Sequence, residues 1–182
     1  VPSFPFGGAI SVSAWVKFSQ FSVGPPGYDP IVDFGDGAPM DNIILVRDGT
    51  TTGLHWGIFH GIESRHLTVA NFWELNVWTH VAATAEGATM KVYKDGVLVG
   101  PNTQGWEPTT MPRAKQYIGR SNWATEPYFA GQIKDAGFHG VALGAEHWSV
   151  YQYVNYQPGS CIDCTISNYQ PVPASISCLK CP

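Results

Sequence analysis

The sequence contains few charged residues and no cluster of positive charge. Asp, Glu, Lys and Arg make up 13% of its 182 residues, which is about half of the usual ~25%. The ten Lys and Arg residues are scattered, and the formal net charge is −4. Proteins that bind nucleic acids or anionic membrane surfaces need basic runs or patches to neutralise phosphates. We therefore expect neither kind of partner.

Long apolar runs are also absent. A membrane-spanning helix needs about 18 or more consecutive apolar residues, and the sequence has no such stretch. We therefore expect no direct membrane insertion by this chain. The sequence starts at Val1 with neither an initiator methionine nor a signal peptide. We accordingly expect it to be a fragment of a longer protein.

Cysteine is missing from the first 160 residues and concentrated after them. The spacing C-x-x-C, a gap of 13 residues and C-x-x-C is compatible with a disulfide framework and is also close to that of a zinc ribbon. We favour disulfides, because a segment of about 22 residues cannot bury a stabilising core. Disulfides would indicate an oxidising, extracellular or secretory compartment. The four residues are Cys161, Cys164, Cys178 and Cys181.

The clearest positive signal is a meander of three predicted strands in residues 77–100. Large and small side chains alternate from Trp78 to Thr84, and a second run follows at residues 89–93. Asp95-Gly96 then separates that run from residues 97–99 and favours a two-residue type I′ turn, whose central residues need positive φ. The pattern predicts an antiparallel, all-β domain.

Similar runs occur along the first 150 residues. The alternation in residues 10–18 predicts a strand with one buried face. A short helical segment is expected at residues 145–152. From the length, we expect one β-sandwich over residues 1–153 and a cysteine-rich segment over residues 154–182. The other predicted strands are residues 30–34, 42–47, 54–60, 67–72, 116–119 and 130–140.

Several of these segments resemble a known family. The WTHVA strand at Trp78, the KVYKDGVLV hairpin and the YIGR strand at Tyr117 resemble the laminin G-like, concanavalin A-like lectin/glucanase domains, over about residues 4–150. This resemblance implies an antiparallel jelly-roll sandwich. The segment of about residues 159–182 resembles the cysteine-rich repeats of ephrin-receptor-like proteins, with Tyr169, Pro171 and Ser175 in the matching places. That resemblance implies disulfide bonding.

The resemblance to glucanases raises the question of catalysis. The retaining glucanases of this fold carry two glutamates on one strand in an E-x-D-x-x-E motif, which places both carboxyl groups in one cleft. That motif is absent here, and no two of the six glutamates lie within ten residues of each other. We therefore expect no enzyme activity, and glycoside hydrolysis is the less favoured function.

Laminin G-like domains often bind calcium at the rim of the sandwich, so the resemblance implies a possible calcium site. Its ligands would come from the acidic cluster of Asp29, Asp33, Asp36 and Asp41, with Asp36 and Asp41 as the best candidates. The alternative is that these residues serve as turn formers, which Asp does through local hydrogen bonds. Metal binding by the histidines is less favoured, and we expect His80 to be structural.

Exposed aromatic residues in two long loops suggest a ligand site. Residues 101–115 contain Trp106, and residues 121–128 contain Asn122, Trp123 and Tyr128. Such residues, with Trp73, either contact a glycan or a protein partner or cover the open end of the sandwich. Our hypothesis is a non-catalytic, extracellular recognition or adhesion module of a larger protein. The alternative is a structural, self-associating subunit of an extracellular filament or coat.

Overall fold

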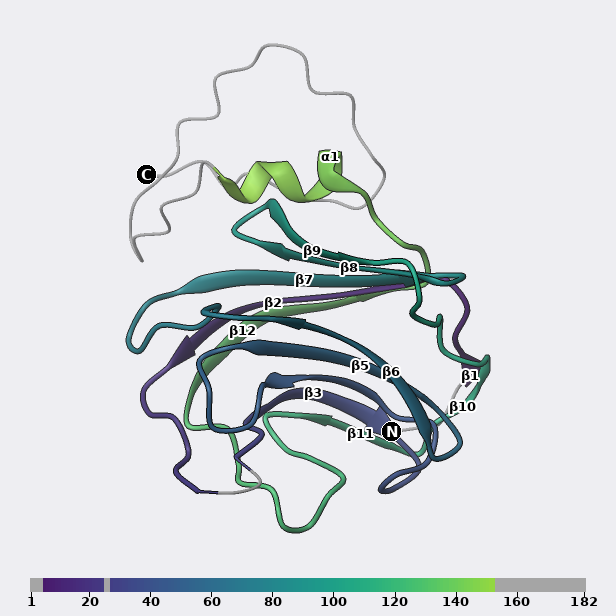
Figure 1. Cartoon of the computed structure of the whole chain (residues 1–182), viewed down its shortest axis with the longest axis horizontal. Helices are drawn as coiled ribbons and strands as arrows, with labels where there is room; N and C mark the ends of the chain where they lie inside the picture. The colour runs from purple at the N-terminus through teal and green to yellow at the C-terminus, as the bar shows by residue number, and fades with distance from the viewer. Residues whose placement is uncertain (1–4, 25–26, 153–182) are drawn as a thin grey trace, which may run out of the picture.

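The computed structural model describes residues 5–24 and 27–152 (Figure 1). Two five-stranded antiparallel sheets pack face to face. The first sheet consists, in spatial order, of β11 (Lys115–Ile118), β3 (Pro30–Gly35), β4 (Ile43–Arg47), β5 (Leu54–His60) and β6 (Glu63–Val69). The second consists of β12 (Gly131–His139), β2 (Ile10–Phe18), β7 (Thr79–Glu86), β8 (Thr89–Lys94) and β9 (Val97–Asn102). The predicted all-β sandwich is confirmed.

The core lies between the two sheets and follows the two-residue period of the strands. Alternate residues of β2, such as Val12 and Val16, face Leu45 of β4 and Trp56 of β5 in one buried cluster. Trp56 donates its indole N–H to the carbonyl oxygen of Thr84, at 3.3 Å. This bond satisfies the polar atom of a fully buried ring. At the rim, β1 (Pro5–Phe6) pairs with β10 (Met111–Pro112).

The central strands of the second sheet, β2 and β7, are buried on both faces, so the prediction of a single buried face for residues 10–18 is wrong. A helical segment, α1 (Ala145–Trp148) followed by the 3₁₀ turn Ser149–Gln152, lies on the outer face of this sheet (Figure 1). Trp148 is fully buried against Ala82 and Tyr93. The hydroxyl of Ser11 is also buried there, and it accepts the backbone N–H of Leu143 at 2.8 Å. Small polar residues on a strand usually indicate a solvent-exposed face, but here the hydroxyl of Ser11 also donates to the carbonyl oxygen of Val141 at 2.7 Å and so binds the segment that precedes the helix.

The hairpin predictions hold with one exception. Asp95 and Gly96 join β8 to β9 with φ values of 48° and 79°, as a type I′ turn requires. The predicted strand at residues 67–72 is wrong, because β6 already begins at Glu63 and ends at Val69. The first residues of β6, Glu63 to His66, are polar, and such a run is typical of a loop. The start of the strand was therefore not recognised in the sequence. Gly61, at φ 58°, allows a tight turn directly after β5.

Candidate ligand-binding site

A cavity of about 300 Å³ opens on the outer face of the first sheet. Because Ile43 and Leu45 of β4 point into the core, Ile44 and Val46 between them point outward. The outward residues of β4, β5 and β6 line the cavity, together with residues of two loops. The lining residues are Tyr28, Ile44, Val46, His55, Phe59, Ser64, His66, Trp123 and Glu126.

Aromatic rings dominate the lining. The rings of His55 and His66 are stacked, with centroids 4.9 Å apart and planes inclined by 23°. Tyr28 meets His55 edge-on at 5.9 Å, and Trp123 lies 5.6 Å from Phe59. Flat apolar faces and polar ring atoms therefore occur side by side in one cavity, the usual composition of a small-molecule site.

Asp33 of β3 anchors the loop of residues 121–128 over the sheet. Its carboxylate is 1% exposed. It accepts hydrogen bonds from the backbone N–H of Asn122 at 2.7 Å, the side-chain amide of Asn122 at 2.8 Å, the amide of Asn42 at 2.7 Å and the hydroxyl of Ser121 at 3.2 Å. Buried hydrogen bonds to an acidic group are among the stronger polar contacts in proteins. The position of Trp123, next in the chain, follows from this anchor.

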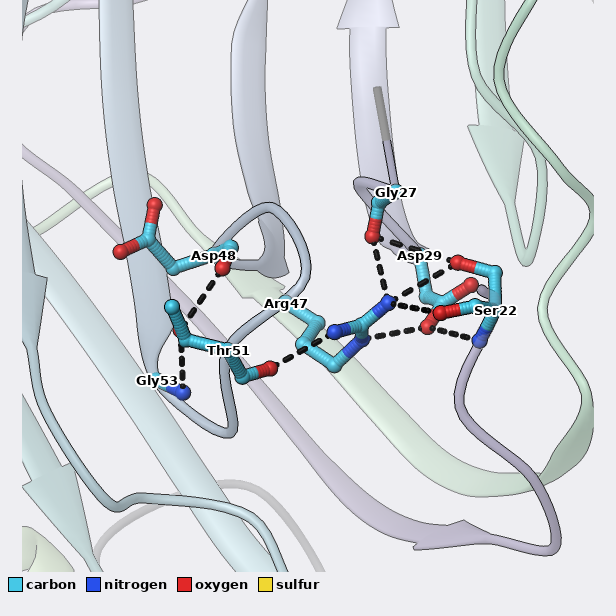
Figure 2. Close-up of polar contacts among 7 residues, drawn as sticks. All are labelled: Ser22, Gly27, Asp29, Arg47, Asp48, Thr51 and Gly53. Carbon is cyan, nitrogen blue, oxygen red and sulfur yellow. Dashed lines mark hydrogen bonds and ion pairs between the residues drawn. The ribbon is translucent and has the colours of Figure 1, made fainter. Parts of the chain in front are cut away.

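A second buried network holds Tyr28 in place (Figure 2). Arg47 at the end of β4 is fully buried and donates to the carboxylate of Asp29, with Nε and Oδ2 2.5 Å apart. Its other nitrogens donate to the carbonyl oxygens of Thr51 at 2.6 Å, Gly27 at 2.6 Å and Ser22 at 2.9 Å. The loop that precedes β3 is thus tied to the sheet on both sides of Tyr28.

Burial changes the charges of two groups in the cavity. Desolvation raises the pKa of Glu126 to about 7, assisted by the negative charges of Asp33 and Asp29 and opposed by a hydrogen bond from Ser121. Desolvation and the neighbouring His66 lower the pKa of His55 to about 4. Near neutral pH, His55 is therefore uncharged and Glu126 is partly protonated.

A smaller cavity of about 210 Å³ adjoins the first. Trp123 and Glu126 line both. The residues that line the smaller one alone are Lys115, Tyr117, Arg120, Ser121, Asn122, Ala124, Pro127 and Tyr128. In Figure 1 the loop after β11 that supplies most of these residues extends beyond the edge of the first sheet, away from α1.

The aromatic residues predicted as one ligand site do not all lie together in the structure. Trp123 and Tyr128 line the cavities, and Tyr128 is 71% exposed. Asn122 uses its amide to bind Asp33 and so holds the loop in place. Trp106 lies elsewhere, with its ring stacked on His60 at 4.4 Å and covered by the guanidinium of Arg65 at 4.6 Å. These contacts fit the alternative that Trp106 closes the end of the sandwich.

Trp73 is buried in the core, at 3% exposure. Four residues of the larger cavity were not predicted from the sequence as ligand-binding residues: Tyr28, His55, Phe59 and His66. A usable signal was the alternation in β5, where the core residues Leu54, Trp56 and Ile58 leave His55 and Phe59 on the opposite face.

The two aspartates proposed for calcium are engaged with the protein. Asp41 accepts the backbone N–H of Gly61 at 2.8 Å, and Asp36 accepts that of Ala114 at 2.9 Å. The guanidinium of the buried Arg113 carries positive charge close to both carboxylates. Among residues 5–24 and 27–152, no group of three or more His, Cys, Asp or Glu side chains is arranged to hold a metal. Calcium binding stays a prediction without support from this geometry.

Cys161, Cys164, Cys178 and Cys181 lie outside the described residues, as does the segment that resembles an ephrin-receptor-like repeat. His80 is 2% exposed and packs against Trp15 and Tyr151, in agreement with a structural role. No helix in the described part of the chain is long and apolar enough to cross a membrane.

Several proteins of known structure share this architecture. No curated protein matches the sequence. Domain 4 of AbnA, a GH43 extracellular arabinanase from Geobacillus stearothermophilus solved in complex with arabinotriose, is 24% identical, with a TM-score of 0.66 over 84% of this chain and 70% of that one. The CBM40 of the Ruminococcus gnavus IT-sialidase, bound to α2,3 sialyllactose, is 14% identical, with a TM-score of 0.62 over 80% of this chain and 82% of that one.

Domains LG4-5 of the mouse laminin α1 chain are 11% identical, with a TM-score of 0.57 over 75% of this chain and 36% of that one. At these identities the similarities establish the fold. The Laminin_G_3 family model, described as concanavalin A-like lectin/glucanases superfamily, matches residues 1–147. The chain therefore belongs to the concanavalin A-like lectin/glucanase superfamily.

Proposed function

We propose that this domain is a carbohydrate-binding module that holds an oligosaccharide against the outer face of the first sheet. The observation that carries the proposal is the cavity of about 300 Å³ in which Trp123, Tyr28 and the stacked pair His55 and His66 surround an apolar floor. Two buried networks fix the loops that supply Trp123 and Tyr28. The cavity walls are therefore preformed, which reduces the entropic cost of binding.

The chemistry of the lining suits a sugar. A sugar ring presents apolar C–H faces and a perimeter of hydroxyl groups, so it needs flat apolar surface together with hydrogen-bonding atoms. Trp123, Ile44 and Val46 offer the first, while Ser64 and His66 offer the second. Two proteins of similar fold were solved with arabinotriose and with sialyllactose, which supports a glycan as the ligand class.

The site does not resemble that of a glycoside hydrolase, and we propose that the domain is non-catalytic. Glycosidases use two carboxyl groups on either side of the scissile bond. Glu126 is the single carboxyl side chain among the residues lining the two cavities. The nearby Asp33 is buried and accepts four hydrogen bonds, so it is not free to act as a nucleophile or base.

The proposal is tested by measuring glycan binding to the wild type and two tryptophan variants. A glycan array followed by isothermal titration calorimetry would identify and quantify a ligand. We expect Trp123→Ala to weaken binding at least about tenfold, because aromatic stacking is lost. Trp78→Ala is the matched control, since Trp78 packs beside Lys134 of the second sheet. Equal affinity of all three proteins, or no binding to any glycan, would contradict the proposal.

We further propose an extracellular setting, because an arabinanase described as extracellular shares the fold and because the cysteine spacing favours disulfides. Intact mass with and without reductant, combined with metal analysis, distinguishes disulfides from a zinc site. The alternative function, a structural subunit that self-associates, stays a prediction. Sedimentation velocity over a range of protein concentrations tests it on the same preparation.

A further inference from the structure

We propose that the smaller cavity is a subsite for a carboxylate, so that the glycan bound by this domain carries an acidic sugar. This inference rests on the proposed glycan-binding function and names the chemical class of its ligand. The cavity lies beside the aromatic one and shares Trp123 with it. A single oligosaccharide can therefore stack a ring on Trp123 and extend an acidic group into the smaller cavity.

Positive charge is concentrated in this cavity although the protein is acidic overall. The chain has ten basic residues and a net charge of −4, yet both Lys115 and Arg120 line the 210 Å³ cavity. Within the described residues, no hydrogen bond or ion pair engages the ammonium group of Lys115 or the guanidinium of Arg120. Their donors are available to a ligand.

The two buried arginines, Arg47 and Arg113, differ from Arg120 in this respect. The guanidinium of Arg47 is occupied by Asp29 and by backbone carbonyls. Arg113 donates to the carbonyl oxygens of Asp41, Phe6 and Thr109. Both arginines are fully buried and tie loops together, whereas Arg120 is exposed at a cavity wall.

Two tyrosines orient the guanidinium of Arg120. Its central carbon lies 4.6 Å from the ring centroid of Tyr117 and 5.9 Å from that of Tyr128. Cation–π contacts of this kind hold a guanidinium while its N–H groups remain directed outward. The planar fork of arginine matches a carboxylate, to which it can donate two parallel hydrogen bonds. Lys115 supplies a second, more mobile positive charge.

Glu126 makes the subsite sensitive to pH. Burial holds its carboxyl group largely protonated below pH 7, so at pH 6 it does not repel an incoming carboxylate. Above pH 7 it ionises and opposes the same ligand. The charged and titratable groups that surround Glu126 are Asp33 and Asp29 beneath the loop, His55 and His66 on the sheet, and Tyr28, Lys115, Tyr117, Arg120 and Tyr128 in the cavity walls. His55 stays neutral at these pH values.

Calorimetry with matched acidic and neutral sugars tests the inference. Trigalacturonate is compared with galactotriose, and sialyllactose with lactose, at pH 6 and low salt; the two pairs distinguish an internal uronate from a terminal sialic acid. We expect at least one acidic sugar to bind about tenfold or more tighter than its neutral match. Arg120→Gln should remove that preference and leave the neutral sugar unaffected. Arg65→Gln, an exposed arginine outside both cavities, is the matched control.

Glu126→Gln gives an independent readout. In the wild type, affinity for the acidic sugar should fall between pH 6 and pH 8, while affinity for the neutral sugar stays constant. Glu126→Gln should abolish that fall, because the repulsive charge no longer forms.

The failure of this inference is distinguishable from that of the proposed function. Binding of neutral sugar that needs Trp123, with the same affinity for acidic sugar, would overturn the carboxylate subsite and leave the proposed function intact. A preference for acidic sugar that Arg120→Gln and Arg65→Gln reduce equally would also overturn the subsite, because it would reflect overall charge. If no sugar binds at all, both proposals fail. Thermal unfolding of each variant shows whether it is folded.

Discussion

Acid should destabilise this domain through one buried histidine. His80 of β7 is 2% exposed beneath the helical segment. Its ring stacks on Tyr151, with centroids 3.6 Å apart, and meets Trp15 edge-on at 5.4 Å. Desolvation, together with repulsion from His147, lowers its pKa from 6.5 to about 4. Replacing His80 with glutamine removes this titrating group.

The sign of the effect follows from proton binding. Between about pH 4 and pH 6.5 the unfolded chain binds a proton at His80 and the folded chain does not, so stability falls as the pH falls. The full contribution is present above pH 6.5. One proton changes the free energy of unfolding by about 1.4 kcal/mol per pH unit, so a shift to about 4 corresponds to a loss of roughly 3 kcal/mol at pH 4.

Other groups with shifted pKa values also titrate in this window, among them His139, whose pKa is lowered by desolvation and by His147, so the test compares slopes between variants. His55, with its pKa lowered to about 4, adds a slope of the same sign. Glu126, with its pKa raised to about 7, adds one of the opposite sign, because the folded chain keeps its proton. Urea unfolding at pH 5, 5.5, 6 and 6.5 gives the slope for each protein. We expect His80→Gln to reduce the mean slope over this range by about 1 kcal/mol per pH unit, because the unfolded chain is only half protonated at His80 at pH 6.5. An unchanged slope would show that His80 titrates normally in the folded state, which would refute the reasoning.

Four further predictions concern positions that fix the loops and strands. Gly131→Ala should destabilise by at least about 2–3 kcal/mol, because the added Cβ would meet the backbone of β2. Gly61→Ala, at φ 58° with open space around it, should lower the free energy of unfolding by only about 1 kcal/mol. Thermal unfolding of both glycine variants measures the two losses. Asp33→Ala should cost about 3 kcal/mol in urea unfolding and also weaken glycan binding, as its loop is released. Arg47→Met should cost about 3–5 kcal/mol, and adding Asp29→Asn should restore part of this loss; full additivity of the two changes would contradict the pairing.

The sequence was informative where local chemistry decides the structure. The Asp95-Gly96 pair predicted its turn, because only a few residues accept positive φ at both central positions. The alternation of apolar residues predicted the core face of β2. It did not reveal that Leu143 and Tyr151, distant in the chain, cover the other face of this strand. A contact of that kind depends on tertiary packing, which no local pattern records.

The candidate site was harder to predict for the same reason. Trp123 and Tyr128 were identified as loop aromatics, yet Trp106 has the same sequence features and packs between His60 and Arg65 instead. His55 and His66 carry no recognisable spacing, because they come from paired strands whose register brings them side by side. The role of Asp33 as an anchor depends on residues about 90 positions away, and local spacing does not show such a partner.

The helical cover on the second sheet makes the two outer faces of the sandwich different from each other. The helical segment lies on the outer face of the second sheet (Figure 1). The aromatic cavity is lined by residues of the first sheet and its loops. No residue that lines the aromatic cavity comes from the helical cover. A ligand can therefore fill the cavity while the buried contacts of Trp148 stay in place.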